Sequence, residues 1–172
     1  SLHDCYLEKL YGSFPGNFSI DVTGYVTNRF EGEPKVLKVN IINCSKLEFD
    51  LENGSKLRID STLVDELRDK KGIINRINFF FENRKFKREL AYNAGWDYYD
   101  KKRRNELSIL EFIDFYGPRV EGSDFDDEEV IIYTSEGDIT LSCENIELEY
   151  DGRKIDPELL YSALNDYWEK LS

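Results

Sequence analysis

The stretch KLEFDLENGSKLRID, residues 46–60, decides the kind of fold that this sequence predicts. From Leu47 to Leu51 its apolar residues alternate with charged ones, which is the period-two pattern of a half-buried strand. The Asn53–Gly54 pair is typical of a tight hairpin turn, because both central residues of such a turn take a positive φ. The segment SKLRI then provides the returning strand. We therefore expect an antiparallel hairpin here.

A helix is expected directly after the hairpin. Asp60 is a good N-cap residue, since its carboxylate can accept hydrogen bonds from the free backbone N–H groups of a first helical turn. Leu63, Val64 and Leu67 follow at the spacing of one buried helical stripe, and Gly72 ends the pattern. Strand, turn, strand and helix thus succeed one another in a short part of the chain.

The rest of the chain continues this mixture. Alternating or β-branched runs predict further strands at 18–28, 35–43, 73–81 and 86–92, and in the segments VIIYTS, DITLSC and IELEY after residue 129. Helical spacing predicts helices at 3–11 and 104–116, and Asp156 followed by Pro157 marks the start of a closing helix. The predicted fold class is α+β, with a mostly antiparallel sheet or sheets and three to four helices packed against one face.

A weak internal repeat accompanies this pattern. LEFD at 47–50, a turn and RID precede the helix predicted after Asp60. LEYD at 148–151, a turn and KID likewise precede the closing helix. Convergence on a common strand–turn–strand–helix arrangement and an ancient duplication both explain the repeat. We expect one domain over residues 1–172, in which duplication would give two similar halves at roughly 18–70 and 104–172.

Charge is divided unevenly along the chain, whose net charge is −12. Residues 1–67 carry 7 Lys and Arg against 11 Asp and Glu, residues 68–104 carry 12 against 5, and residues 105–172 carry 4 against 19. The net charges of these three parts are −4, +7 and −15. Fields of this kind influence the choice of partners and the rate of encounter more than they influence the fold.

Most common catalytic and cofactor chemistry lacks its residues in this sequence. His3 is the single histidine, and Cys5, Cys44 and Cys143 form no CxxC pair, so neither a zinc site nor an imidazole-based triad is expected. No phosphate-binding GxxxxGKS/T or GxGxxG loop occurs. We expect no metal, no cofactor and no catalytic residue. A hydrolase built on two carboxylates is an alternative, because 35 acidic residues offer many pairs.

Two surfaces are candidates for binding a partner. The acidic stretch EGSDFDDEE at 121–129 predicts an exposed loop, to which Glu144, Glu147 and Glu149 add further carboxylates. Binding of Ca²⁺ by this loop is an alternative, although its spacing differs from that of an EF-hand. The second surface lies in the basic, aromatic stretch 84–104, whose rings and cations can anchor a protein. The residues expected to contact a partner are Asp124, Asp126, Asp127, Glu128, Glu129, Trp96, Tyr98, Tyr99 and Arg103.

The sequence therefore predicts a non-catalytic acidic binding protein that docks a protein partner with a basic surface. Inhibitor and toxin-neutralising proteins of bacteria and phages share this character, which is a likeness of class and not of family. Stacking of single-stranded nucleic acid on the stretch 84–104 is the alternative within the binding class. No membrane-spanning run and no signal peptide is visible, so we expect a soluble cytoplasmic protein, with a removed upstream targeting segment left open.

Overall fold

The computed structural model of this chain is built around one large antiparallel sheet. It describes residues 5–24, 36–52, 54, 56–71, 74–82, 85–94, 108–112, 119–126, 128–160 and 162. The thirteen strands are β1 (Cys5–Phe14), β2 (Gly16–Gly24), β3 (Leu37–Cys44), β4 (Lys46–Leu51), β5 (Lys56–Asp60), β6 (Ile74–Glu82), β7 (Lys85–Ala94), β8 (Ser108–Phe112), β9 (Arg119–Phe125), β10 (Glu129–Thr134), β11 (Gly137–Ser142), β12 (Asn145–Tyr150) and β13 (Arg153–Ile155). Helix α2 spans Ser61–Lys71, and a further helical turn covers residues 157–160.

The predicted α+β fold class is wrong, because strands account for most of the described chain. In the ranges given above, the helices are α2 and the turn at 157–160, not three to four helices on one face of a sheet. The strands predicted at 18–28, 35–43, 73–81 and 86–92 are confirmed as far as the described residues extend. The errors lie where a helix was expected and a strand is found.

A β-bulge explains why β1 replaces the helix predicted at 3–11. The register of β1 against β2 shifts between Leu7 and Lys9, so Glu8 is an extra residue in β1. Leu7 and Leu10 are therefore both buried although they lie three positions apart. A bulged strand thus imitates the spacing of a helix.

The helix predicted at 104–116 is also wrong in its described part, where β8 pairs with β7. The run SILEF contains Ile, Leu and Phe, which fit a pleated surface as well as a helical stripe. A run of this length does not decide between helix and strand by itself. Pairing with the edge of β7 makes it a strand. The acidic stretch 121–129 likewise forms the end of β9 before it turns, rather than a loop throughout.

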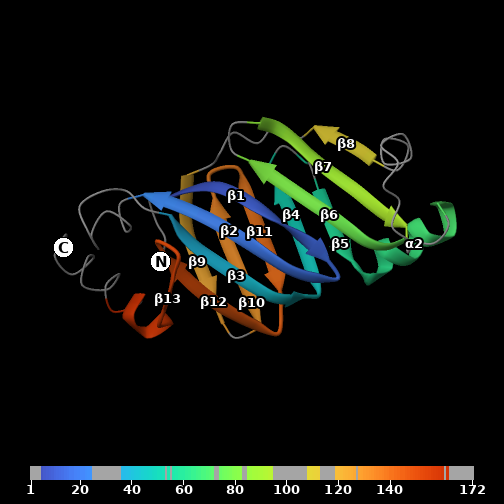
Figure 1. Ribbon diagram of the computed structural model, residues 1–172. Coiled ribbons are helices and arrows are strands. Elements are labelled where there is room, and N and C mark those ends of the chain that lie inside the picture. The colour runs from blue at the N-terminus through green and yellow to red at the C-terminus, as the bar shows by residue number, and fades with distance from the viewer. Residues whose placement is uncertain are drawn as a thin grey trace.

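The sheet folds into two layers around a shared core. Figure 1 shows β1, β2, β3 and β12 running across the front of β9, β10, β11 and β4. Both layers contribute to one cluster of buried side chains, which includes Leu10, Phe18, Ile20, Val39, Phe49, Ile132, Ile139 and Leu141. The alternation of side chains along each strand sends every second residue into this core.

The chain passes between the layers at one tight corner. Only Ser45 separates β3 from β4, and the facing strands β12 and β11 are separated by two residues. Ser45 N donates to Ser142 O at 2.8 Å, and Glu144 N donates to Ile42 O at 3.0 Å, so the ladder continues around the bend. Asn43 takes a left-handed conformation with φ of 51° at this bend.

The order of strands reads the same from both ends. The main path is β13-β12-β3-β2-β1-β9-β10-β11-β4-β5, so β1 corresponds to β9, β2 to β10, β3 to β11, β4 to β12 and β5 to β13. The central pair is Tyr6 opposite Arg119, and β9 carries an extra residue, Glu121, as β1 carries Glu8. We call residues 5–71 the first half and residues 119–162 the second half. Their common ancestry stays a prediction.

Each half gives its hairpin to the other. The hairpin β4–β5 pairs with β11 of the second half, and the hairpin β12–β13 pairs with β3 of the first half. Strands β6, β7 and β8 form an insertion between the halves, and β6 pairs with β1 beside its contact with β9. Helix α2 packs against β5 and β6 at this side of the molecule.

Candidate functional site: a groove with an acidic rim

A groove of about 390 Å³ opens in the second half. It lies between the end of β9, strand β12 and the helical turn at 157–160. Its apolar lining comes from Phe125, Ile146, Leu148 and Leu160, of which the last two are almost completely buried. The volume falls near the lower end of the roughly 300–1,000 Å³ typical of ligand sites, which is enough for a few side chains.

The rim of the groove carries three exposed carboxylates, Asp126, Asp156 and Glu158. None of them forms an ion pair with a Lys or Arg among the residues that the structure describes. Carboxylates without a cationic partner in the described chain therefore surround an apolar floor. This combination attracts a group that is cationic at one point and apolar at another.

Asp126 is held in place by the turn that it forms between β9 and β10. Its Oδ1 accepts hydrogen bonds from Glu128 N at 2.8 Å and Glu129 N at 2.7 Å, while Asp126 N donates to Glu129 O at 3.0 Å. An Asp side chain that accepts from the backbone two residues on is a common turn-forming device. The carboxylate is thus fixed at the mouth of the groove.

Asp156 begins the helical turn on the opposite side. Its Oδ1 accepts from Glu158 N at 2.9 Å, and its backbone O accepts from Leu159 N at 3.0 Å and Leu160 N at 3.3 Å. Pro157 suits the first helical position because no N–H is needed there. The turn places Leu160 inside, at 2% exposure, and leaves Leu159 outside, at 59%.

In the first half, the position that corresponds to the groove is filled by a side chain. Gly12 of β1 corresponds to Phe125 of β9, and Phe79 of β6 lies opposite Gly12 in the sheet. The ring of Phe79 packs between Phe18 and Phe49, with centroid distances of 6.5 and 5.7 Å. Among the described residues of the second half, β9 pairs with β1 and β10, and no strand takes the place of β6. The groove therefore occupies the position that β6 fills in the first half.

A row of alternating charges crosses the outer face of the front layer. Registered pairs join Glu82, Lys9, Asp21, Lys38, Glu149 and Lys154 in that order across six strands. Opposite charges that face each other across strands stabilise a sheet modestly. Burial raises the pKa of Asp21, and the charges of Lys38 and Lys9 oppose this shift only in part.

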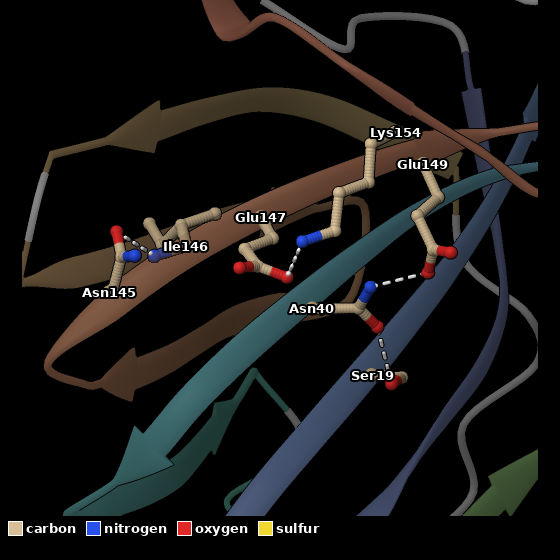
Figure 2. A network of polar contacts seen from close by, with 7 residues as sticks. All are labelled: Ser19, Asn40, Asn145, Ile146, Glu147, Glu149 and Lys154. Carbon is tan, nitrogen blue, oxygen red and sulfur yellow. Dashed lines mark hydrogen bonds and ion pairs between the residues drawn. The ribbon is translucent and has the colours of Figure 1, made fainter.

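Figure 2 shows how this face engages two of the predicted docking carboxylates. Lys154 Nζ lies 3.1 Å from Glu147 Oε2, and Asn40 Nδ2 donates to Glu149 Oε2 at 2.5 Å. Ser19 Oγ donates in turn to Asn40 Oδ1 at 2.9 Å. Because side chains alternate along β12, Glu147 and Glu149 lie on the opposite face from the groove.

The predicted acidic surface is therefore divided among several places. Asp126 reaches the groove, whereas Asp124 Oδ2 accepts from Tyr133 Oη at 2.8 Å, and this hydrogen bond raises the pKa of Tyr133. Glu128 is exposed in the same turn as Asp126, and Glu144 Oε2 accepts from Asn43 Nδ2 at 2.7 Å at the corner. The positions of Asp127, Trp96, Tyr98, Tyr99 and Arg103 lie outside the described residues.

Sequence reasoning missed the apolar lining of the groove. Ile146 and Leu148 lie in the predicted strand IELEY, and Leu160 lies in the predicted closing helix, so the sequence pattern assigns each to its own element and not to a shared site. The groove forms only because β9, β12 and the helical turn meet around it. The available signal was the repeat of hairpin and helix, since its first copy is followed by a strand that the second copy lacks in the described chain.

Within the described ranges, no group of three or more His, Cys, Asp and Glu side chains is arranged to hold a metal ion. All three cysteines are free and buried, and burial raises the pKa of Cys44 to about 11 and that of Cys143 in the same direction. No helix among the described residues has the length and apolar character needed to cross a membrane.

Comparison with known proteins identified no relative of this chain. A scan against protein-family models, a search of curated proteins and a search of solved structures each found no match. The fold and the groove therefore define a class in structural terms, an antiparallel β protein with exchanged hairpins and an acidic-rimmed apolar groove.

Proposed function

We propose that this protein is a non-catalytic binding protein that docks a protein partner through the acidic-rimmed groove, by means of a cationic part of the partner's surface. One observation carries the proposal: three rim carboxylates without an ion-pair partner in the described chain surround an apolar floor. Apolar contacts supply most of the affinity in such a site. Uncompensated charge at the rim accelerates encounter and rejects acidic surfaces.

The electrostatic setting supports a cationic partner over an anionic one. The groove lies in the part of the chain that carries 19 Asp and Glu against 4 Lys and Arg. At physiological salt the Debye length is about 8 Å, so the rim carboxylates act on a group that arrives at the groove and little beyond it. A nucleic-acid phosphate would be repelled at this site.

The test uses charge reversal at positions that no turn or cap depends on. Glu128→Lys and Glu158→Lys together change the charge beside the groove by four units and leave the carboxylates of Asp126 and Asp156 in place. The matched control is Glu66→Lys with Asp69→Lys, which makes the same change on exposed positions of α2.

The wild type, the groove variant and the control variant are each immobilised and exposed to nuclease-treated proteins of the source cell. A basic protein that is retained by the wild type and by the control, and is lost from the groove variant, is the expected result. Its association rate should also fall severalfold as salt rises toward physiological strength. Retention of the same proteins by all three chains would refute the proposal.

A further inference from the structure

We propose that the groove binds an extended segment of the partner that places a large apolar side chain, flanked by Lys or Arg, where β6 places Phe79 in the first half. This inference rests on the proposed function and specifies what enters the groove. Its basis is the correspondence between the two halves. We call the space beside β1 in the first half, and the groove beside β9 in the second half, the slot of each half; in the first half the slot is occupied by Phe79.

The first half serves as the template for the occupied slot. Phe79 is 2% exposed, and its ring lies against Phe18 and Phe49. Strand β6, which carries it, pairs with β1 and β7 and contacts α2. An extended segment with an aromatic side chain is therefore a natural occupant of a slot of this construction.

The second half repeats the walls of this slot with smaller filling. Leu148 occupies the strand position that corresponds to Phe49, because it lies opposite Val39 as Phe49 lies opposite Ile139. Each half also has a buried apolar residue four positions after its capping Asp, Val64 after Asp60 and Leu160 after Asp156. Phe125 lines the groove from the strand position where the first half has Gly12, and the groove of about 390 Å³ remains open beside it. The space is thus large enough to admit a side chain from outside.

The rims of the two slots differ in charge, and this difference selects the flanks of the occupant. The first-half slot has Ser13 and Thr62 at the positions that correspond to Asp126 and Glu158. Its capping carboxylate, Asp60, is compensated by Arg58 Nε at 2.6 Å. The second-half slot instead presents three carboxylates, so a segment with cations beside its apolar anchor fits it best.

Three short peptides separate the contributions of the anchor and the flanks. Each is an acetylated and amidated pentapeptide with Thr at the second and fourth positions. The first has Phe in the centre and Arg at both ends, the second replaces Phe with Ala, and the third replaces both Arg with Glu. Binding is measured by titration calorimetry and by the chemical shifts of the full chain in NMR spectra, at low salt and at physiological salt.

We expect the peptide with Phe and Arg to bind at least tenfold more tightly than either of the other two, with shifts at Ile146 and Leu160. The groove variant with Lys at 128 and 158 should lose this preference, and the control variant with Lys at 66 and 69 should keep it. Equal affinity of the Phe and Ala peptides would overturn the inference, because the site would then read charge alone. Spermidine that competes as well as the first peptide would overturn it in the same way.

The outcomes also distinguish this inference from the proposed function. A captured basic partner together with no peptide binding at millimolar concentration keeps the binding function and overturns the extended segment. Peptide binding in the expected order without any captured partner supports the extended segment as the ligand of the groove and overturns docking of a basic protein of the source cell. A wild-type dimer that dissociates in the groove variant, measured by sedimentation equilibrium, would assign the groove to a second copy of the chain and overturn both.

Discussion

Replacement of Phe79 by Ala should destabilise the protein much more than replacement of Phe125 by Ala. Phe79 is 2% exposed and contacts two other rings, so its loss leaves a cavity in the core of the first half. Phe-to-Ala changes at such sites cost about 3–5 kcal/mol. Phe125 is only partly buried and borders the groove, so its truncation enlarges a space that already exists. The loss of buried apolar surface lowers the free energy of unfolding by about 1–2 kcal/mol.

The comparison is made by urea denaturation of the wild type and the two variants, followed by circular dichroism and tryptophan fluorescence. With an m-value of about 2 kcal/mol per molar urea, the two transition midpoints should differ by about 1 M. The slopes should agree among the three proteins, which shows that the variants differ in stability and not in the extent of unfolding. Equal losses at the two positions would refute the correspondence, because Phe125 would then be packed as fully as Phe79 and no slot would be open.

Four further predictions concern the backbone and the titrating groups. Gly12→Ala should cost at least about 1–3 kcal/mol in urea denaturation, since a Cβ there would lie 2.7 Å from backbone Cα of the facing strand; an unchanged midpoint would contradict this. Asp60→Ala should cost about 1–2 kcal/mol at pH 7 through loss of the N-cap. Burial opposes the charge of Asp60, but its hydrogen bonds and its ion pair with Arg58 lower the pKa of this carboxyl in the folded state. Its contribution to the free energy of unfolding is therefore present above the unfolded pKa and is lost as pH falls through the folded pKa. Asp21→Asn should show the opposite dependence, because a raised pKa means that the ionised carboxylate costs free energy above the folded pKa and the cost disappears in acid; parallel pH profiles for the two sites would contradict the assignment. Iodoacetamide should modify Cys44 of the native chain slowly at pH 8, since with a pKa of about 11 only about one of its thiols in a thousand is ionised, and labelling of Cys44 within minutes, located by peptide mass spectrometry, would be inconsistent with this.

Local signals predicted the central hairpin correctly. Strands β4 and β5 form the pair expected in residues 46–60. Asp60 Oδ1 accepts from Leu63 N at 3.0 Å, so the predicted N-cap of α2 is confirmed. Alternation and a cap both act within a few residues, and no distant contact is needed for them to take effect. The tight turn at Asn53–Gly54 stays a prediction, because Asn53 lies outside the described residues.

Contacts between distant segments account for what local signals did not predict. The bulge at Glu8 depends on the partner strand β2, and it converts strand spacing into apparent helical spacing. The exchange of hairpins places β4 against β11, far away in the sequence, and period-two alternation carries no information on which strand is the partner. A strand pattern thus predicts an element and one buried face, and leaves the topology open.

The internal repeat also shows how a sequence likeness can differ from a structural one. The repeat aligns LEFD at 47–50 with LEYD at 148–151, which would match Phe49 with Tyr150. The registers instead match Phe49 with Leu148, two residues earlier. Because a shift of two residues keeps the same face of a strand toward the core, both alignments preserve the alternation of buried residues. The sequence pattern alone does not choose between them.

The carboxylates of the predicted acidic docking surface differ in how each is paired within the chain. The acidic third of the chain suggested a single docking surface, yet Glu147 is paired with Lys154 and Glu149 is hydrogen-bonded to Asn40. A carboxylate that is already balanced loses these contacts when it turns to a partner, so it adds little to affinity. Asp126 and Glu158 meet no such cation in the described chain, and they stand beside exposed space with an apolar floor. Within the described chain no Lys or Arg stabilises their charge, so a cation from a partner gains more here than beside Glu147 and Glu149, and this is the physical reason to expect the partner at the groove and not on the outer face of the sheet.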